Sequence, residues 1–464
     1  MPEARTRHQP QDSVLYAVVR DHLDEFLRAA RGHGALPAFI EKTFRAFLKC
    51  GIPEFGCLRL WCPACGHDDV VAFSCKKRGV CPSCSTRAGG DGAAHLVDHV
   101  LPRVPMRQWV VSYPFELNGK LAFQPALLSA TERVVMGVLS DWQQARGGGQ
   151  SGGVLVRHRF GSALNVQVHC HILMTDGVYC SGADGVPVFE QTREPAQTEL
   201  DTLATTLRGR LHTLFKRRGL LGKHDDSNLP EQLDALGACV KTAMGKGRRE
   251  RGGPALSLVA DEEAERPTGG RVAQVDGLNL YASPVIPAGD RGALEKICRY
   301  LLRGPLALGR LKQRADGMLT YRLKKPDKRG NTLVVMTPVE LLMRLASLIP
   351  APRFATRRYF GVLAAGARLR KLVVPRPTQR KNQHCADPDV TRPPVQSPVK
   401  WADLLKRVWG LEALACARCG GTMKALAVLE DRGEIARFLA HLGQTTMHQR
   451  ATGPPDRMEQ DPAA

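Results

Sequence analysis

The chain has no run of eighteen apolar residues, and its first 14 residues are polar with no apolar core. A membrane-spanning helix needs about 20 apolar residues, and a secretory signal needs an apolar segment of about 7–15. The sequence therefore predicts a cytoplasmic protein with no membrane partner. In that reducing compartment, we expect the 14 cysteines to be metal ligands or buried thiols rather than disulfides.

A phosphate-binding loop is also lacking. The glycine-rich loop at 147–153 has no Gly-Lys-Ser/Thr ending, and the Gly-Lys-Gly at 245–247 follows no apolar strand. Both features are needed to cradle the phosphates of ATP. We therefore predict no nucleotide cofactor.

Acidic residues are scarce beside basic ones: 45 Asp and Glu stand against 66 Lys and Arg, a net charge of +21. Residues 291–400 hold 24 basic and six acidic residues, so nearly all of the net charge arises there. A folded region with so one-sided a balance more often meets a polyanion than solvent alone. Nucleic acid is the predicted partner.

The length of 464 residues predicts two or three domains. Helices are expected at 12–31, with Asp12 as N-cap, and at 37–49, ahead of a cysteine cluster. The prolines between 373 and 400 indicate a linker. The predicted parts are a helical, cysteine-rich zinc-binding domain (1–104), a larger domain (105–372), the linker (373–400), a small C-terminal domain (401–444) and a disordered tail (445–464).

Within the larger domain the pattern predicts a strand at 108–113, a helix at 125–144, and strands at 154–160 and 164–174. This order favours the α+β class, with an antiparallel or mixed sheet and helices to one side, over a doubly wound parallel sheet.

Two Cys-x-x-Cys knuckles, Cys62–Cys65 and Cys81–Cys84, stand fifteen residues apart, with Cys75 between them. Each knuckle offers two sulfurs from one turn, as a tetrahedral zinc site requires. A site closed by four thiolates has no open position, so we predict structural Zn2+. The four ligands are expected among these five cysteines, and the spare ligands could hold a second ion.

A third knuckle, Cys416–Cys419, stands alone near the C-terminus. Two thiolates do not make a zinc site, so a tight turn is expected unless His441 and His448 complete one.

The segment from Asn165 to Ile172 carries the strongest catalytic signal. Strand alternation places Asn165, Gln167, His169 and His171 on one face and core residues on the other. Two imidazoles one residue apart on a strand make a preformed half-site for a divalent metal that stays open to substrate.

Tyr300 is the candidate nucleophile. Residues 290–303 predict a helix with Asp290 as N-cap and a stop at Gly304-Pro305, and Tyr300 lies off its apolar stripe. The competing interpretation is an ordinary boundary tyrosine with a half-buried ring. DNA-contacting side chains are predicted on this helix, just beyond it, and in a hairpin at 320–331; they are Lys296, Arg299, Arg303, Arg310, Arg322, Lys324, Lys325, Lys328 and Arg329.

Several motifs together resemble one family. They are Cys62-x2-Cys65 with the run from Ser74 to Cys84, Phe160 to Asn165 leading to His169-x-His171 and Asp176 to Tyr179, Arg299 to Arg303 with Leu306, Ala307 and Arg310, and Tyr359 with 361–364. With them the chain resembles, from about residue 50 to 444, the rolling-circle transposases of the insertion-sequence-91 family. That family lies within the HUH endonuclease superfamily, named for its histidine, hydrophobic residue, histidine motif.

The resemblance implies that His169 and His171, with a third polar ligand, hold Mg2+ or Mn2+ against a phosphate of single-stranded DNA. It implies that Tyr300 attacks the phosphorus to form a 5′-phosphotyrosine, without ATP, and that the protein works in the bacterial cytoplasm and nucleoid. Gln167 shares the histidine face and is the first choice as third ligand, Asn165 lies farther along it, and His158 serves if the two strands pair.

The chain departs from the family's two-tyrosine pattern, because Gly304 stands where a second tyrosine would follow Tyr300 by four residues. It resembles the single-tyrosine branch. Successive strand transfers must then reuse Tyr300, use a second protomer of a homodimer, or use another nucleophile.

Two rival functions fit part of the sequence. A metallo-hydrolase of the His-x-His-x-Asp-His kind would need a carboxylate where the chain has Leu173. A zinc-finger DNA-binding regulator without catalysis would explain the cysteines and the charge, but would leave the histidine strand and Tyr300 unused.

Overall fold

The computed structural model describes residues 9–182, 184–220, 234–245, 247–251, 270–327, 329–375, 402–403, 406–407 and 412–443. Contacts between residues divide the chain into two compact units. The smaller comprises 1–17, 45–76 and 400–464, and the larger comprises 18–44 and 77–399. This division cuts the chain differently from the predicted domains, because a C-terminal segment joins an early one.

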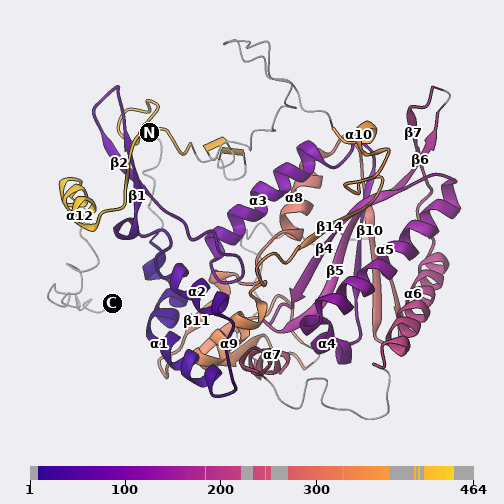
Figure 1. Ribbon diagram of the computed structural model, residues 1–464, viewed down its shortest axis with the longest axis horizontal. Coiled ribbons are helices and arrows are strands. Elements are labelled where there is room, and N and C mark those ends of the chain that lie inside the picture. Colours follow the sequence, from indigo (N-terminus) through magenta and orange to yellow (C-terminus); the bar gives the residue numbers. More distant parts are fainter. Residues whose placement is uncertain are drawn as a thin grey trace, which may run out of the picture. The chain divides into compact units, whose positions relative to one another are not determined.

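The larger unit is built on a six-stranded antiparallel sheet (Figure 1). Its strands, in spatial order, are β14 (Arg357–Gly361), β4 (Gly152–Phe160), β5 (Val166–Thr175), β3 (Met106–Ser112), β10 (Leu278–Ile286) and β9 (Arg271–Val275). The predicted strands at 108–113, 154–160 and 164–174 are confirmed as β3, β4 and β5.

Alternation along β5 separates two cores. Val166, Val168, Cys170 and Ile172 join one buried cluster with residues of α5 (Pro125–Gly147), α6 (Gln197–Arg217) and α7 (Ala235–Met244). Leu173, of opposite parity, joins the other cluster, with residues of α3 (Pro82–His99) and α8 (Arg291–Leu301). The α+β class and the antiparallel sheet are therefore as predicted, but helices pack on both faces of the sheet, not on one.

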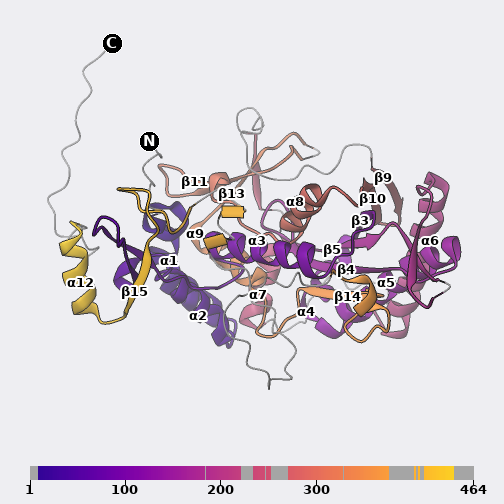
Figure 2. The ribbon, with the colours of Figure 1, turned by 90° about the horizontal axis from the view of Figure 1, so that it is seen from above.

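The α3 and α8 helices lie side by side (Figures 1 and 2). Glycines of α3 allow this approach: a Cβ atom at Gly92 would lie 2.8 Å from Leu302 Cδ1, and one at Gly89 would lie 3.1 Å from the Leu302 carbonyl oxygen. The C-terminal end of α8 is thereby held against α3.

The larger unit also contains a second sheet, a hairpin and further helices. A four-stranded antiparallel sheet contains, in spatial order, β11 (Leu311–Gln313), β12 (Leu319–Arg322), β13 (Leu333–Met336) and β8 (Arg248–Glu250). A separate hairpin pairs β6 (Gly177–Ser181) with β7 (Pro187–Gln191). The other helices are α4 (Asn118–Phe123), α9 (Pro338–Leu348) and α10 (Arg370–Val373), together with α2 (Ala38–Phe47), whose residues up to 44 belong to this unit.

The smaller unit contains a three-stranded antiparallel sheet in the order β15 (Lys424–Leu429), β1 (Cys57–Trp61) and β2 (Asp68–Ala72). The α12 helix (Arg432–His441) packs on it through Ile435 and Leu439, which share a core with Cys57 and Val70.

The first long helix, α1 (Val14–Arg31), begins two residues later than predicted. The Ser13 hydroxyl accepts a hydrogen bond from the Tyr16 amide at 3.2 Å, so Ser13 caps this helix. The predicted cap, Asp12, ends a short 3-10 turn instead. No helix in the described part of the chain is long and apolar enough to span a membrane.

Candidate active site

Three histidines meet on the α3 and α8 face of the main sheet. In the β4–β5 register His158 lies directly opposite His169, and the ring centroids of His158 and His171 are 4.5 Å apart. The other two centroid distances are 5.1 Å for His158–His169 and 5.0 Å for His169–His171. One ring nitrogen from each residue lies within 4.8 Å of the others. Three neutral imidazoles so placed fit a divalent metal ion.

Hydrogen bonds orient two of these rings. His158 Nε2 lies 2.6 Å from the Leu301 carbonyl oxygen and must donate to it. Its buried Nδ1, which has no hydrogen-bond partner among the described residues, then carries the lone pair. His169 Nδ1 donates to the Gln167 carbonyl oxygen at 3.0 Å, so its Nε2 carries the lone pair. Such outer contacts fix the tautomer that a metal ligand requires.

The third ring is held by Gln108, whose side-chain amide lies 2.9 Å from His171 Nδ1. Both side chains are buried. In the structure the amide nitrogen of Gln108 donates to Nδ1. With the amide turned round, its oxygen would accept from Nδ1 and leave Nε2 for a metal. Gln108 was not among the predicted site residues, although its place at the start of the predicted strand at 108–113 is a signal that could have identified it.

Burial, followed by the repulsion of His169, holds the pKa of His158 well below its usual value. His158 is therefore a neutral imidazole at pH 7, as metal binding requires. Burial also raises the pKa of Cys170 to about 12. The residue between the two histidines of β5 is thus a neutral core thiol, as its place in the opposite core indicates.

Gln167, the first choice for third ligand, is exposed. Its amide oxygen would lie 2.5 Å from a Cβ atom at Gly161, so its side chain approaches the turn between β4 and β5. Among the three candidates that the sequence left open, His158 is the one that the β4–β5 pairing sets directly opposite a histidine of the pair.

Tyr300 lies on α8, which follows the predicted pattern closely. The Asp290 carboxylate caps the helix by accepting from the Ala293 amide at 2.8 Å, and the buried residues are Leu294, Ile297, Cys298 and Leu301. The helix ends at Leu301, two residues earlier than predicted.

The Tyr300 ring packs against one of the histidines, His171. Its centroid lies 5.8 Å from that of His171, with the planes at 89°. Two cations also approach this ring: Arg303 Cζ at 4.2 Å and Lys324 Nζ at 5.6 Å from its centroid. The half-buried Tyr300 ring thus lies beside the histidine cluster and close to two positive side chains that suit a phosphate.

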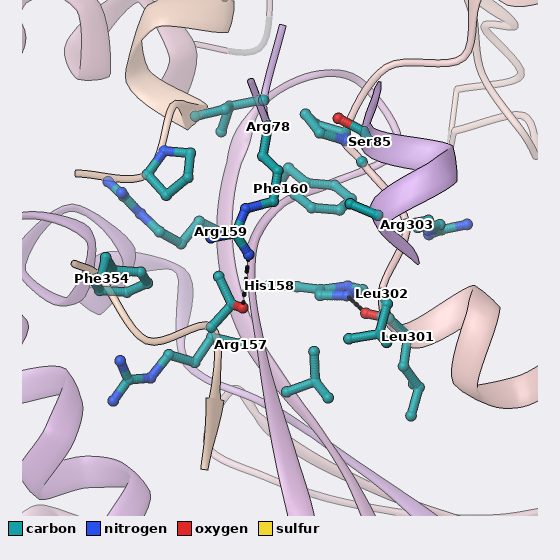
Figure 3. A pocket seen from close by; sticks show the side chains of 18 of the residues that line it. Arg78, Ser85, Arg157, His158, Arg159, Phe160, Leu301, Leu302, Arg303 and Phe354 are labelled. Carbon is teal, nitrogen blue, oxygen red and sulfur yellow. Dashed lines mark hydrogen bonds between the residues drawn. The ribbon is translucent and has the colours of Figure 1, made fainter. Parts of the chain in front are cut away.

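A cavity of about 120 Å³ opens beside His158 (Figure 3). Five arginines line it: Arg78, Arg157, Arg159, Arg303 and Arg357. Arg157 is paired with the buried Glu132, with 2.5 Å between Nε and Oε1. The other four give the cavity a basic lining. Because Leu301, Leu302 and Arg303 also form its wall, the cavity adjoins the segment that follows Tyr300.

Gly304 packs against α3. A Cβ atom at Gly304 would lie 2.8 Å from Ser85 Cβ and 3.1 Å from Ser85 Oγ. A tyrosine at this position, as in the two-tyrosine pattern, would therefore have to displace Ser85. The single-tyrosine arrangement is supported by this close packing.

This contact yields a stability prediction. Gly304→Ala should lower the free energy of unfolding by about 1–3 kcal/mol through overpacking, as measured by chemical denaturation. Adding Ser85→Gly should recover most of that loss, because it removes the clashing atoms. If the losses of unfolding free energy from the two single changes simply added in the double variant, the close contact between Gly304 and Ser85 would be contradicted.

The predicted hairpin is confirmed as β12 and β13, paired from Leu319–Met336 to Arg322–Leu333. Hydrogen bonds from Asn331, first from its side chain and then from its amide, lower the pKa of Asp327 to about 2. The Asp327 carboxylate also accepts from the Arg329 amide at 2.9 Å. This ionised side chain orders the turn that carries the basic residues.

Most of the predicted DNA-contacting residues are accessible. Lys296, Lys324, Lys325 and Arg329 are exposed, and Arg299, Arg303 and Arg322 are half-buried. Lys328 lies outside the described residues.

Arg310 requires a correction. It is 9% exposed, and its guanidinium donates to the carbonyl oxygens of Arg322 at 2.6 Å and Ser162 at 2.8 Å. It therefore ties two backbone segments together. Its burial does not suit the DNA contact predicted for it.

The cysteines are grouped differently from the prediction. Four of the five cysteines Cys62, Cys65, Cys75, Cys81 and Cys84 were expected to share one zinc ion. In the smaller unit, however, Cys62 and Cys65 lie with Cys416 and Cys419, all four Sγ atoms being within 4.8 Å of one another. The third knuckle is thus not an isolated turn, and His441 is not part of the group. His448 lies outside the described residues.

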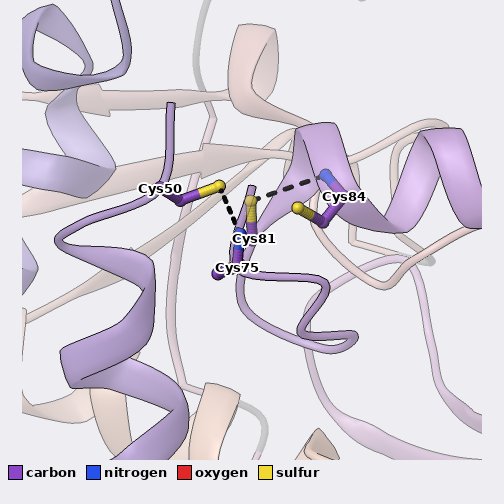
Figure 4. Close-up of side chains that lie close together, drawn as sticks. All are labelled: Cys50, Cys75, Cys81 and Cys84. Carbon is purple, nitrogen blue, oxygen red and sulfur yellow. Dashed lines mark hydrogen bonds between the residues drawn. The ribbon is translucent and has the colours of Figure 1, made fainter. Parts of the chain in front are cut away.

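Figure 4 shows four further cysteines of the N-terminal part of the chain: Cys50, Cys75, Cys81 and Cys84. In the smaller unit the Cys75 amide donates to Cys50 Sγ at 3.2 Å. In the larger unit Cys81 is the N-cap of α3, and its Sγ accepts from the Cys84 amide at 3.5 Å. Amides that point at sulfur favour the thiolate form that zinc requires.

Two family models match the chain. Residues 152–371 match the model Y2_Tnp, described as "Putative transposase", and residues 18–113 match the model Zn_Tnp_IS91, described as "Transposase zinc-binding domain". The two ranges occur in this order and together cover more than half of the chain. No curated protein and no solved structure matches.

Proposed function

This chain belongs to the insertion-sequence-91 family of transposases, and from that premise we propose that it nicks single-stranded DNA at element ends through Tyr300. The proposed reaction is rolling-circle transposition, with a 5′-phosphotyrosine intermediate and rejoining of the strand at a new site. The observation that carries this proposal is the contact between Tyr300 and His171, which sets a phenol beside three clustered imidazoles.

We propose that His158, His169 and His171 hold a divalent metal ion, Mg2+ or Mn2+. Gln167 is the alternative third ligand. When bound, such an ion polarises a phosphoryl oxygen and neutralises charge that develops on the phosphate. Three nitrogen ligands suit Mn2+ better than Mg2+, which prefers oxygen.

The side chains of the protein supply the rest of the reaction. Tyr300 Oη attacks the phosphorus, the Oη–P bond forms, and the P–O3′ bond breaks. The phenol proton passes, in net balance, to the departing 3′ oxygen. Arg303 and Lys324, which approach the Tyr300 ring, attract the scissile phosphate to the phenol. The hydrogen bond from His158 to the Leu301 carbonyl fixes the end of α8, and with it Tyr300, relative to the histidine cluster.

With one tyrosine in the site, each round of cleavage and joining needs the phenol to be released before it acts again. A second protomer would supply another tyrosine. We therefore propose that strand transfer uses either one chain sequentially or a homodimer.

Positive side chains around the hairpin turn make the proposed DNA interface. If about six of them each neutralise one phosphate, the logarithm of the affinity for single-stranded DNA should fall against the logarithm of salt concentration with a slope of about −4. Fluorescence anisotropy across a salt series measures this slope. A slope near zero would rule out this interface.

The zinc-binding domain is part of the matched family, and Zn2+ is its structural ion. Within residues 18–113, five cysteines remain once Cys62 and Cys65 are assigned to the other group: Cys50, Cys57, Cys75, Cys81 and Cys84. We propose that the predicted knuckle Cys81–Cys84 supplies two of its ligands. A zinc ion held by four thiolates has no open coordination position for catalysis.

The direct test is to incubate the purified protein with a labelled single-stranded oligonucleotide that carries an element end, with Mg2+ or Mn2+, and to run a denaturing gel. A label that migrates with the protein, and that a chelator abolishes, supports the proposal. Binding without any covalent product would favour the rival, a DNA-binding regulator with no catalysis.

A further inference from the structure

The smaller unit contains two copies of one backbone structure. Cys62-Pro-Ala-Cys65-Gly66 and Cys416-Ala-Arg-Cys419-Gly420 share the pattern Cys-x-x-Cys-Gly. Both glycines are left-handed, with φ of 71° and 74°, a conformation that favours glycine.

The hydrogen bonds of the two turns correspond as well. The amide of each glycine donates to the carbonyl of the first cysteine, at 2.9 Å in both turns. The amide of the first cysteine donates to the residue five positions later, at 2.8 Å for Cys62 to His67 and 2.7 Å for Cys416 to Gly421. Both turns therefore present their two sulfurs in the same way.

The sulfurs of the two turns face each other. Cys62 Sγ lies 3.5 Å from Cys419 Sγ, and Cys65 Sγ lies 3.6 Å from Cys416 Sγ. All four residues are free thiols. Around a zinc ion with Zn–S bonds of about 2.3 Å, tetrahedral sulfurs lie about 3.8 Å apart. The observed spacing is close to that value.

The site is part of a folded sheet. The β15 strand pairs with β1 in antiparallel register, including Trp61 opposite Lys424, immediately next to both turns. Cys62 and Cys416 are 0% and 1% exposed and share a small core with Leu60 and Met423. Gly421 passes so close that a Cβ atom there would lie 3.5 Å from Cys62 Sγ.

We propose that Cys62, Cys65, Cys416 and Cys419 bind one structural zinc ion that joins an early and a late segment of the chain. Cys62 and Cys419 are 357 residues apart in sequence, and the second turn lies far beyond residue 113, where the matched zinc-binding domain ends. The matched zinc-binding domain therefore contains only two of the four ligands of this metal site, on which the sheet of the smaller unit depends. The inference stands independently of nicking by Tyr300.

The test measures zinc per full-length chain by elemental analysis. Cys62→Ser/Cys65→Ser and Cys416→Ser/Cys419→Ser should each lose one zinc relative to the wild type, and the variant with all four changes should also lose only one. Cys180→Ser, at a half-buried thiol of the other unit, should lose none. Zinc content unchanged in Cys416→Ser/Cys419→Ser, or a loss of two in the fourfold variant, would overturn the shared site.

A second pair of variants separates lost ligation from lost folding. Cys419 is exposed, so a larger side chain fits there. Cys419→His should retain the zinc because imidazole is also a zinc ligand, whereas Cys419→Ala should bind it measurably more weakly in a chelator competition. Equal zinc retention by both variants would contradict ligation by Cys419.

Discussion

Tyr300→Phe is expected to abolish covalent attachment of the protein to single-stranded DNA, lowering the adduct yield by at least about 10³-fold. The substitution removes one oxygen and leaves the ring that packs against His171. Binding of the same strand, measured by anisotropy, should therefore stay within about twofold of the wild type. Loss of the adduct with retained binding separates the nucleophile from a packing residue.

The matched control is Tyr359→Phe. Tyr359 is also half-buried in the larger unit and also lies beneath a cation, with Arg370 Cζ 5.5 Å from its ring centroid. It is not among the rings that contact the histidine cluster in the described residues. Its variant should form the adduct at the wild-type rate. If Tyr359→Phe lost the adduct while Tyr300→Phe kept it, Tyr359 would be the nucleophile.

His158→Ala is expected to weaken the apparent affinity for Mn2+ by at least about 100-fold. The reason is that a buried ring nitrogen facing the other two imidazoles is removed. Gln167→Ala should change that affinity by less than about threefold, because the exposed amide contributes no ligand in this arrangement. Mn2+ titrations of the nicking rate, together with Mn2+ binding by electron paramagnetic resonance, measure both effects.

This pair of variants identifies the third ligand. A large loss of Mn2+ affinity in Gln167→Ala, with little loss in His158→Ala, would identify Gln167, the first choice from sequence, as the third ligand. His158 also donates a hydrogen bond to the Leu301 carbonyl. The nicking rate of its variant is therefore compared with that of the wild type at saturating Mn2+. Nicking that recovers there reports lost ligation, whereas nicking that stays low reports a displaced α8.

Local patterns predicted much of the site. Alternation in β5 correctly separated the histidine face from the core face, and the apolar stripe and the cap of α8 gave the place of Tyr300 on its helix. Both patterns depend on interactions within one element, where periodicity and capping act directly.

Long-range pairing was harder to predict. The approach of His158 depends on the register of β4 against β5, which shifts between His158 and Phe160, and spacing along one strand does not specify that shift. The group of Cys62, Cys65, Cys416 and Cys419 depends on contacts between segments 357 residues apart. The repeated Cys-x-x-Cys-Gly pattern was the available signal for it. The DNA contact predicted for Arg310 was wrong for a similar reason. A basic composition does not distinguish a DNA contact from a buried guanidinium that donates to backbone carbonyls.

The central claim is tested most directly by identifying the DNA-linked residue. The protein is trapped on an element-end oligonucleotide, the complex is digested with protease and nuclease, and the nucleotide-bearing peptide is sequenced by mass spectrometry. We expect a peptide with Tyr300 joined to a 5′-phosphate. A nucleotide on any other residue, or cleavage of the oligonucleotide with no linked peptide, would contradict the account.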